Sequence, residues 1–578
     1  MENEKKYSLL KVIGIAFLLY VVLTWFIPTG NFAGGEFVKG ETAPLGLYGI
    51  FTAPVYSFAV FAQYIVLILC VGGFYGVLNK TGVYQKIVSY LASKDKTKFL
   101  IATVIVFALV TSVLGETMMV FVLLPFFIAV LLKMGYDRLS SLSATVGGGL
   151  IGMVASISGN MAIYKNYFGL DPKIFVLFNI IMLLILVFLL SMFIISKNSK
   201  KSVKNEEIPL FEVVKNNKKS SLPLIIILIV LALLLLLGLF NWYYAFGIDI
   251  FTKFHEKIMS IQLFKTNIMS KIFGEFSEIG YFSNYDVSAI LLVSSFIISW
   301  VYSIKFNDFI DSFKDGAKKM LLPGIYVVFA SVVFSQIVTS NAGNISLTIS
   351  HFILGLFKDF NILTGFLTGI VGSFFYNDYL YLMNGLYGTI SLYNNSMMPF
   401  ILAVFQSMFG VMMFILPVSI TLIGGLKYLN ISYKEIGNQT VSILFREQNS
   451  NIKVLEAITC PFKLGYKENH AAWNSVVLTV TGDWLRTIYY KYQDDLFSAN
   501  YRGFLGLAKK TINTGIKNTA EKNPDNFWAY NNGITILTNR MEVRKDETIL
   551  HGMSIINGAQ TTGSIGSLDL KIDLRGVQ

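Results

Sequence analysis

The sequence predicts an α-helical polytopic membrane protein with two repeated halves and broken helices or hairpins, followed by a small α+β soluble segment. Three observations support this fold class: a step in composition near residue 445, a series of long apolar runs, and a pattern of polar interruptions that occurs twice. Of the 578 residues, 54% are hydrophobic and only 14% are charged, and the mean hydropathy is +0.60. Soluble domains are nearer to about a quarter charged.

Charge is distributed unevenly along the chain, and the change marks a boundary. Residues 1–445 contain 31 Lys and Arg and 22 Asp and Glu, which makes about 12% of that part charged. Residues 446–578 contain 16 and 13, which makes about 22% charged, a normal value for a globular protein. We therefore predict a polytopic membrane domain at 1–435, a junction at 436–460 and a soluble segment at 461–578.

The excess of positive charge lies beside the apolar runs. Loop 80–98 has five Lys against one Asp, and loop 197–220 has seven Lys against three Glu. Cytoplasmic loops of membrane proteins carry such an excess. We therefore predict a multi-pass protein of the cytoplasmic (inner) membrane with both loops and the tail in the cytoplasm, and with segment 248–285 outside. The lipid bilayer is then the main partner, and nucleic acid is not expected for the membrane part.

Apolar runs of about twenty residues, the length that crosses the hydrocarbon of a bilayer, recur through the first part. The N-terminal run is interpreted as a first transmembrane helix because no clear cleavage site follows it. Segment 305–319 is amphipathic, and we expect it to lie along the membrane interface. The candidate spans are 9–28, 58–79, 99–114, 116–133, 173–196, 222–247, 287–304, 321–338 and 397–425, with less regular ones at 143–163, 345–359 and 362–383.

The basic loop 197–220 divides two halves that follow one pattern. In each half an apolar run reaches a small polar tip, a second apolar run follows, and the next span is interrupted by polar residues. The tips are LGET (114–117) and TSNAGN (339–344), and the interruptions are SISGN (156–160) and SFFYNDYLYLMNG (373–385). Irregular backbone at membrane depth is tolerated only where protein or water satisfies it. Paired interruptions in two halves indicate the binding site of a secondary transporter.

Two long apolar stretches, 99–132 and 360–426, each contain a single charged residue, Glu116 and Asp378 respectively. A lone carboxylate in lipid is costly, so it normally faces a cavity, an ion or a partner. Both are predicted to ligate a coupling cation (H⁺ or Na⁺), to accept a proton or to pair with the amine of a small-molecule substrate. Solvation in a loop near the interface is the alternative.

Uncharged polar residues crowd the same interruptions and offer hydroxyl and amide groups, although packing between helices is an alternative role for them. Cys70 and Cys460 lie in different parts of the chain, and the four histidines are scattered, so no metal site, cofactor or enzyme is predicted. The sequence leaves a homo-oligomer open. The predicted substrate- and ion-binding residues are Glu116, Thr117, Ser158, Asn160, Ser340, Asn341, Asn344, Asn377 and Asp378.

The first 440 residues resemble a family of carriers. NKTG after the second span, LGET, LLPFFIAVLLKMGYD and TSNAGNISLTIS occur in the order seen in permeases of the YfcC type, which are related to four-carbon dicarboxylate and arginine/ornithine carriers of the ion-transporter superfamily. The resemblance implies inverted repeats with two hairpins. It also implies a secondary active transporter of small organic anions or amino acids.

The soluble segment resembles a second family. Residues 474–482 alternate like a strand, 496–520 are predicted to be helical, and two Asn-Gly pairs indicate turns flanked by strand-like runs. The stretches LFSANYRGFLG, NNGITIL and IINGAQTT, within residues 470–566, resemble AIPR proteins, which are associated with abortive infection and phage resistance. The resemblance carries over, without chemical roles, the motif positions Asn500, Arg502, Asn531, Asn532, Asn557 and Gln560.

The tail is expected to be a truncated AIPR-like segment, because it has only about 130 residues. An accidental gene join is one interpretation of the fusion. The alternative is a membrane-anchored phage-defence protein, in which the membrane part anchors the tail or acts as its effector.

Overall fold

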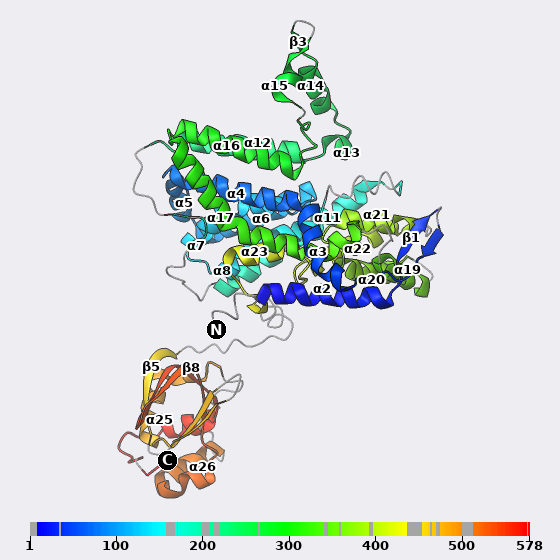
Figure 1. The fold of residues 1–578 in the computed structure, drawn as a ribbon. Coiled ribbons are helices and arrows are strands. Elements are labelled where there is room, and N and C mark those ends of the chain that lie inside the picture. The colour runs from blue at the N-terminus through cyan, green and yellow to red at the C-terminus, as the bar shows by residue number, and fades with distance from the viewer. Residues whose placement is uncertain are drawn as a thin grey trace. The chain divides into compact units, whose positions relative to one another are not determined.

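The computed structural model divides the chain into two compact units, Met1–Gly437 and Asn438–Gln578 (Figure 1). Each unit has its own hydrophobic core. The structure describes residues 8–33, 36–157, 168–169, 171–198, 208–212, 219–263, 266–274, 276–339, 345–357, 360–391, 397–435, 454–462, 465–469, 474–499, 512–574 and 576–578.

The first unit is a bundle of apolar helices, as the sequence predicts. Within the described residues, six helices are long and apolar enough to cross a membrane, and a seventh span is formed by a bent pair. This confirms the predicted helical membrane class. The six helices are α2 (Ser8–Phe26), α4 (Ala62–Lys80), α6 (Lys96–Leu114), α11 (Pro172–Asn198), α12 (Leu222–Leu239) and α16 (Asn284–Val301).

The bent pair joins α17 (Phe306–Ala330) to α18 (Val332–Thr339) at an angle of 51°. The expectation that segment 305–319 lies along the interface is wrong, because this segment is the first part of the continuous helix α17. Its apolar side packs against protein: Phe309 is buried, and the Gly316 backbone touches α4 so closely that a Cβ on Gly316 would lie 2.1 Å from the Gly72 carbonyl oxygen. Close approach at small residues is typical of helix packing in membranes.

The remaining apolar helices are shorter than a full span. The predicted single span 397–425 is two helices, because the chain turns at 413–419 around Pro417. The predicted span 58–79 begins at α4, since Phe61 separates it from α3. The short helices are α3 (Leu47–Val60), α7 (Met119–Lys133), α9 (Gly148–Val154), α19 (Ile345–Phe357), α20 (Ile362–Ser373), α21 (Tyr379–Ile390), α22 (Met398–Met412) and α23 (Ile420–Leu429).

Small elements connect the spans. The hairpin β1–β2 (Gly30–Ala33, Glu36–Lys39) follows α2. Helix α5 (Tyr84–Ala92) follows α4, and α8 (Arg138–Leu142) with the π-helix η1 (Ser143–Gly147) leads into α9. Between α12 and α16 lie α13 (Trp242–Phe246), α14 (Ile250–Met259), the short hairpin β3–β4 (Gln262–Leu263, Thr266–Asn267) and α15 (Ile268–Phe273).

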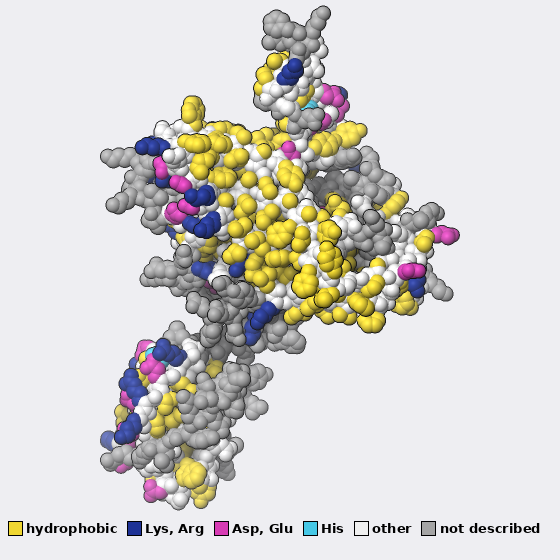
Figure 2. All heavy atoms as spheres, in the orientation of Figure 1, with side chains coloured by type: hydrophobic (Ala, Val, Ile, Leu, Met, Phe, Trp, Pro, Cys, Tyr) yellow, Lys and Arg dark blue, Asp and Glu magenta, His cyan; other side chains and the backbone are white. Residues whose placement is uncertain are grey.

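The outside of the first unit separates apolar from charged surface. Large hydrophobic side chains cover the middle of the bundle in Figure 2; a few charged side chains lie at the right end, and a larger group of basic and acidic side chains lies at the left end. At that end the two predicted cytoplasmic loops meet, because Lys86 donates to the Lys219 carbonyl at 3.3 Å. Lys219 in turn donates to the carbonyl of Tyr302. We call this end, with Lys80, Lys86, Lys133 and Lys219, the lysine-rich face.

The second unit is a small α+β fold. Its three-stranded antiparallel sheet has the order β5–β9–β8 (Val454–Pro461, Glu547–Asn557, Thr535–Val543), and a separate hairpin pairs β6 (Gly465–Asn469) with β7 (Asn474–Leu478). The helices are α25 (Gly482–Tyr492), α26 (Ile512–Lys522), α27 (Phe527–Tyr530) and α28 (Ala559–Gly566), with 3₁₀ turns η2 (Gln493–Phe497) and η3 (Pro524–Asn526).

The predictions for this unit hold in part. The strand predicted at 474–482 is present as β7, but it ends at Leu478 and α25 begins at Gly482. The helix predicted at 496–520 is confirmed from Ile512 onward as α26; its start is wrong, because Leu496 and Phe497 end the 3₁₀ turn η2. Residues 500–511 of that prediction lie outside the described ranges.

Candidate functional site

The first polar tip is the turn of a helical hairpin. Helix α6 ends at Gly115, whose φ of +69° is a left-handed conformation that favours glycine. The other ends of α6 and α7 are held together, because Lys96 Nζ donates to the Gly135 carbonyl at 3.3 Å and Tyr136 Oη donates to the Lys96 carbonyl at 3.2 Å. Glu116 therefore sits at the tip of an antiparallel hairpin.

The two helices of the hairpin differ in length. Helix α7 has 15 residues, and at about 1.5 Å per residue it is roughly 22 Å long. The hydrocarbon of a bilayer is about 30 Å thick. Helix α6 has 19 residues and is long enough to span on its own, so α7 is the arm of the hairpin that falls short of a full crossing.

The second interruption of the first half follows α9, and neighbouring side chains satisfy its backbone. Ser112 Oγ donates to the Ala155 carbonyl at 2.6 Å, and the Ile157 amide donates to the Ser112 carbonyl at 2.8 Å. Asn179 Nδ2 donates to the Ser156 carbonyl at 2.9 Å. Irregular backbone at membrane depth needs such internal partners, so this break is a built feature of the fold.

In the second half, two breaks are joined by one hydrogen bond. The chain bends at Ser331 between α17 and α18, and it breaks again at 374–378 between α20 and α21. Asn377 Nδ2 donates to Ser331 Oγ at 2.9 Å. Both residues are buried, so the bond couples the bend in one span to the break in another.

Asp378 has a structural contact as well as a candidate functional role. Its Oδ1 accepts hydrogen bonds from the backbone amides of Leu380 at 2.7 Å and Tyr381 at 3.4 Å. A carboxylate in this position caps the start of a helix and complements its dipole. Asp378 therefore caps α21 at the point where that helix starts inside the bundle.

The breaks of the two halves converge. The Glu116 carboxylate accepts a hydrogen bond from the Asn284 amide at the start of α16, and it interacts electrostatically with Asp378. The phenol of Tyr64, on α4, interacts with both carboxylates. Elements from both halves thus bring two acidic side chains to one place, which the isolated charges of the sequence alone could not establish.

A small pocket lies at this meeting point. Its volume is about 10 Å³, roughly what a single water molecule needs. On its border, Gln406 Nε2 of α22 donates to the Met153 carbonyl at 3.3 Å. The pocket is lined by Gly115, Met153, Ser156, Asp378, Tyr379, Leu380 and Gln406. Three of the four breaks described above therefore reach it, and the Ser331 bend does not.

Two buried amide oxygens, one beside Glu116 and one on the chain neighbour of Asp378, lack a hydrogen-bond partner. Within the described part of the chain, Asn284 Oδ1 and Asn377 Oδ1 are buried and unpaired. An unpaired buried acceptor costs about 1–3 kcal/mol. Carboxylate and amide oxygens together suit a hard cation or a proton. No group of three or more His, Cys, Asp or Glu suited to a metal occurs in the part of the chain that was searched.

The predicted site residues fall into two groups. Glu116, Asn377 and Asp378 are described and lie at the converging breaks, and Thr117 follows Glu116 in the hairpin turn. The sequence missed Tyr64, Asn284 and Gln406. Gln406 carried a signal, since it is the one amide side chain in the predicted span 397–425. The residues outside the described ranges are Ser158, Asn160, Ser340, Asn341 and Asn344.

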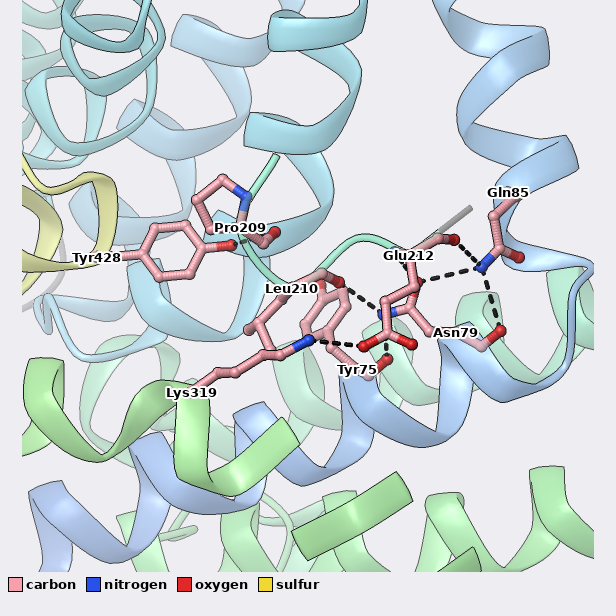
Figure 3. A network of polar contacts seen from close by, with 8 residues as sticks. All are labelled: Tyr75, Asn79, Gln85, Pro209, Leu210, Glu212, Lys319 and Tyr428. Carbon is pink, nitrogen blue, oxygen red and sulfur yellow. Dashed lines mark hydrogen bonds and ion pairs between the residues drawn. The ribbon is translucent and has the colours of Figure 1, made fainter. Parts of the chain in front are cut away.

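The inter-half loop makes a second polar cluster, at the lysine-rich face (Figure 3). Asn79 Nδ2 donates to the Leu210 carbonyl at 2.6 Å, and Gln85 Nε2 donates to the Glu212 carbonyl at 2.8 Å. The Glu212 carboxylate pairs with Lys319 of α17 at 2.6 Å. Residues 208–212 therefore form a strap that contacts α4 and α5 of the first half and α17 of the second.

In the second unit, the two Asn-Gly pairs approach each other. Gly558 has a φ of +84°, and a Cβ there would lie 2.6 Å from the Gly533 carbonyl oxygen. The pairs are turns, as predicted, but each has a helix on one side, because α27 precedes Gly533 and α28 follows Gly558. Glycine is required at Gly558 by both its backbone angle and its contact.

The motif positions Gln560 and Asn531 make hydrogen bonds at the same place. Asn513 Nδ2 donates to Gln560 Oε1 at 2.7 Å, and Asn531 Nδ2 donates to the Phe527 carbonyl at 2.9 Å. Asn532 and Asn557 are exposed beside these contacts. The motif therefore stabilises one local arrangement of turns. Asn500 and Arg502 belong to the residues that the structure does not describe.

Comparison with known proteins yields two family matches and a structural likeness. Residues 7–446 match the family described as C4-dicarboxylate anaerobic carrier, and residues 497–575 match the family described as AIPR protein. Among solved structures, the YdaH transporter of Alcanivorax borkumensis is similar over 75% of this chain and 90% of its own, with 17% identity and a TM-score of 0.30. No curated protein sequence matches the chain significantly.

Proposed function

Because the chain belongs to the C4-dicarboxylate anaerobic carrier family, we propose that its membrane unit is a secondary active transporter of small organic anions. Four-carbon dicarboxylates are the first candidate substrates. Amino acids are the second, and they would follow from the narrower resemblance to YfcC-type permeases. The observation that carries the proposal is that breaks from both halves line one small pocket, through Gly115 and Ser156 in the first half and Asp378 in the second, and that Glu116, next to Gly115, interacts electrostatically with Asp378.

The two carboxylates suit a coupling cation better than the anionic substrate. Like charges repel, and two acidic groups at one buried site favour a proton or a sodium ion between them. The unpaired oxygens of Asn284 and Asn377 supply further ligands of the same kind. We propose that H⁺ or Na⁺ binds here and is transported with the substrate.

Asp378 offers a route by which the cation and the substrate communicate. Its carboxylate occupies the amides of Leu380 and Tyr381 at the start of α21, and such amides bind anions well. A proton or cation on Asp378 weakens its hold on these amides. A carboxylate of the substrate can then take its place, so that substrate binding requires the coupling ion.

Uptake into vesicles tests the proposal. The full chain is reconstituted into liposomes, and uptake of labelled four-carbon dicarboxylates and amino acids is measured with imposed proton and sodium gradients. We expect saturable uptake that depends on one gradient and falls in both Glu116→Gln and Asp378→Asn. Non-saturating flux contradicts a carrier, and unchanged uptake in both variants removes these residues from the mechanism.

The orientation follows from the lysine-rich face. Loops 80–98 and 197–220 meet there, and the positive-inside rule places such a face in the cytoplasm. We propose the cytoplasmic membrane as the location. Single cysteines at Ser220 and Ser260, labelled from outside with an impermeant thiol reagent, test this orientation. Labelling of position 220 and protection of position 260 would invert it.

A second candidate function is membrane-anchored phage defence. The match of residues 497–575 to AIPR proteins favours it, as does the separate hydrophobic core of the second unit. We propose a cytoplasmic tail in this case. Plaque counts on cells that carry the full chain or a chain ending at residue 437 test it. Protection that needs the tail supports defence, and equal plaque counts leave the transporter as the function.

A further inference from the structure

Helix α14, in the segment between α12 and α16, has one apolar side that is exposed. Ile250, Phe254 and Ile258 recur at every fourth residue and so share a side. Glu256 lies on the opposite side, and Lys253 and Lys257 flank the apolar side. Ile250 is 63% exposed and Phe254 is 55% exposed. A short helix with this division, outside the spans, needs an apolar surface against which to rest.

The segment is fixed to the end of a span that faces away from the lysine-rich face. The amides of Gly280 and Phe282 both donate to the Gly238 carbonyl near the end of α12, each at 2.9 Å. At the other end of the two spans, Lys219 precedes α12 and donates to the carbonyl of Tyr302, which follows α16. The segment therefore leaves the bundle and returns at one point on the opposite side of the membrane.

Aromatic side chains mark that point as the membrane surface. The rings of Phe240 and Trp242 are 4.7 Å apart, and Trp242 also contacts Phe251 of α14 at 5.5 Å. Trp and Tyr concentrate where hydrocarbon meets headgroups, and Trp242 is the ring that both other members of this cluster contact. This cluster begins directly after the last residue of α12, Leu239, so α14 is tied to the level of the interface.

The direction in which α13, α14 and α15 leave the bundle is also consistent with a position at the membrane interface. Figure 1 shows α13, α14 and α15 projecting sideways from the ends of α12 and α16, at a steep angle to both helices. A segment that leaves the ends of two spans in this sideways direction runs along the membrane surface. Its path therefore lies over the lipid that surrounds α12, whose surface is largely unburied in the protein.

The charged residues of this segment indicate what kind of lipid surface it can bind. The described charged residues of the segment balance, and Lys253 pairs with Asp249 at 2.6 Å on α14 itself. Binding by charge to anionic lipid would require a net positive segment. Apolar burial is the remaining attraction, and it does not depend on headgroup charge. The charged residues are Asp249, Lys253, Glu256, Lys257, Lys271 and Glu278.

We propose that residues 242–282 form an interfacial anchor, in which α14 lies in the headgroup region of the leaflet opposite the lysine-rich face. Ile250, Phe254 and Ile258 point toward the acyl chains, and Glu256 faces water. The occupant of the exposed side is thus the lipid surface, with no preference for anionic headgroups. The anchor is independent of the transported substrate.

Depth-dependent quenching tests the anchor in the full chain. Cys70 and Cys460 are replaced by Ala, single cysteines are introduced by Phe254→Cys or Glu256→Cys, and each is labelled with an environment-sensitive fluorophore. Glu256 is the matched control because it is exposed on the opposite side of the same helix. Vesicles of phosphatidylcholine, with or without phosphatidylglycerol, contain lipids with a spin label near the headgroup end of the chain.

We expect lipid quenching at position 254 to exceed that at position 256 by about twofold or more, and quenching by aqueous iodide to show the reverse order. The ratio should be the same in both lipid mixtures and in high salt. Equal iodide quenching at both positions overturns the anchor. Protection of position 254 from iodide without lipid quenching also overturns it, since protein then covers the helix, and cross-linking between copies would show whether a second chain does so.

Discussion

The two halves of the membrane unit both place an acidic residue at a helix break, but the two carboxylates are held differently. Glu116, at the tip of the α6–α7 hairpin, takes its hydrogen bond from the Asn284 side chain. Asp378 takes its hydrogen bonds from the backbone of α21, which it caps. The sequence pattern treats these residues alike, whereas the structure gives Asp378 a role in the fold and leaves Glu116 tied to another side chain.

This difference predicts how each residue responds to substitution. A residue that caps a helix contributes to stability as well as to function. Its two roles are separated by comparing a replacement that removes both the cap and the charge with one that removes only the charge. A residue held by one side chain contributes less to the fold. The halves are therefore compared best through variants that remove charge, capping or a hydrogen bond one at a time.

The largest effect is expected at Asp378. Asp378→Ala removes the cap and the charge, so we expect the free energy of unfolding in mild detergent to fall by about 1 kcal/mol and gradient-driven uptake to fall at least about tenfold. Asp378→Asn is the matched control, because Asn also caps helices well but carries no charge. We expect it to keep the stability and to lose the uptake. Full uptake in the Asn variant would reduce Asp378 to a cap.

Glu116→Gln is expected to have the second largest effect. Gln can still accept the hydrogen bond from Asn284, so stability should change by less than about 0.5 kcal/mol. Uptake should again fall at least about tenfold, because the charge at the meeting point is lost. Initial rates of uptake and thermal melts on the same preparation measure both quantities. A stability loss equal to that of Asp378→Ala would show that the two halves do not differ in the proposed way.

The sequence indicated where the breaks and their acidic residues lie, but it did not indicate which residues surround them. Isolated charges in apolar runs located Glu116 and Asp378, because a lone carboxylate at membrane depth is rarely without a role. The partners Tyr64 and Asn284 come from helices far away in the sequence, and no local pattern indicates such contacts. Asn284 follows the capping residue Ser283 at the start of α16. From the sequence, it is therefore expected to be only the first residue of a helix and not a partner of Glu116.

Amphipathic segments show a second limit of prediction. Segment 305–319 and helix α14 have the same kind of periodicity, yet the first packs against α4 and the second is exposed. Periodicity identifies an apolar side without identifying what covers it. The turn at 413–419 was also missed, although Pro417 signals it, because the apolar run on both sides fits a single span.

A smaller effect on uptake is expected from the hydrogen bond between Asn377 and Ser331, which links the two breaks of the second half at 2.9 Å. Ser331→Ala leaves a buried amide donor unpaired, so stability should fall by about 1–3 kcal/mol while uptake falls only a few fold. Asn377→Ala and the double variant complete a double-mutant cycle. We expect a coupling energy of about 1 kcal/mol. Additive effects would mean that the two breaks are independent.

The smallest effect is expected where the strap joins the two halves. Glu212 and Lys319 are 2.6 Å apart, but their side chains are 59% and 47% exposed, so water and salt screen the pair and its contribution should be below about 1 kcal/mol. Glu212→Lys places two positive groups together and should lower the melting temperature slightly, more at low salt than at high salt. The exchanged variant, Glu212→Lys with Lys319→Glu, should restore it.

Because the Asn79 and Gln85 hydrogen bonds to the strap backbone remain in each variant, uptake should change by less than about twofold. A large loss of uptake in Glu212→Lys that the exchange repairs would instead make this ion pair, and not the buried breaks, the contact through which the halves depend on each other.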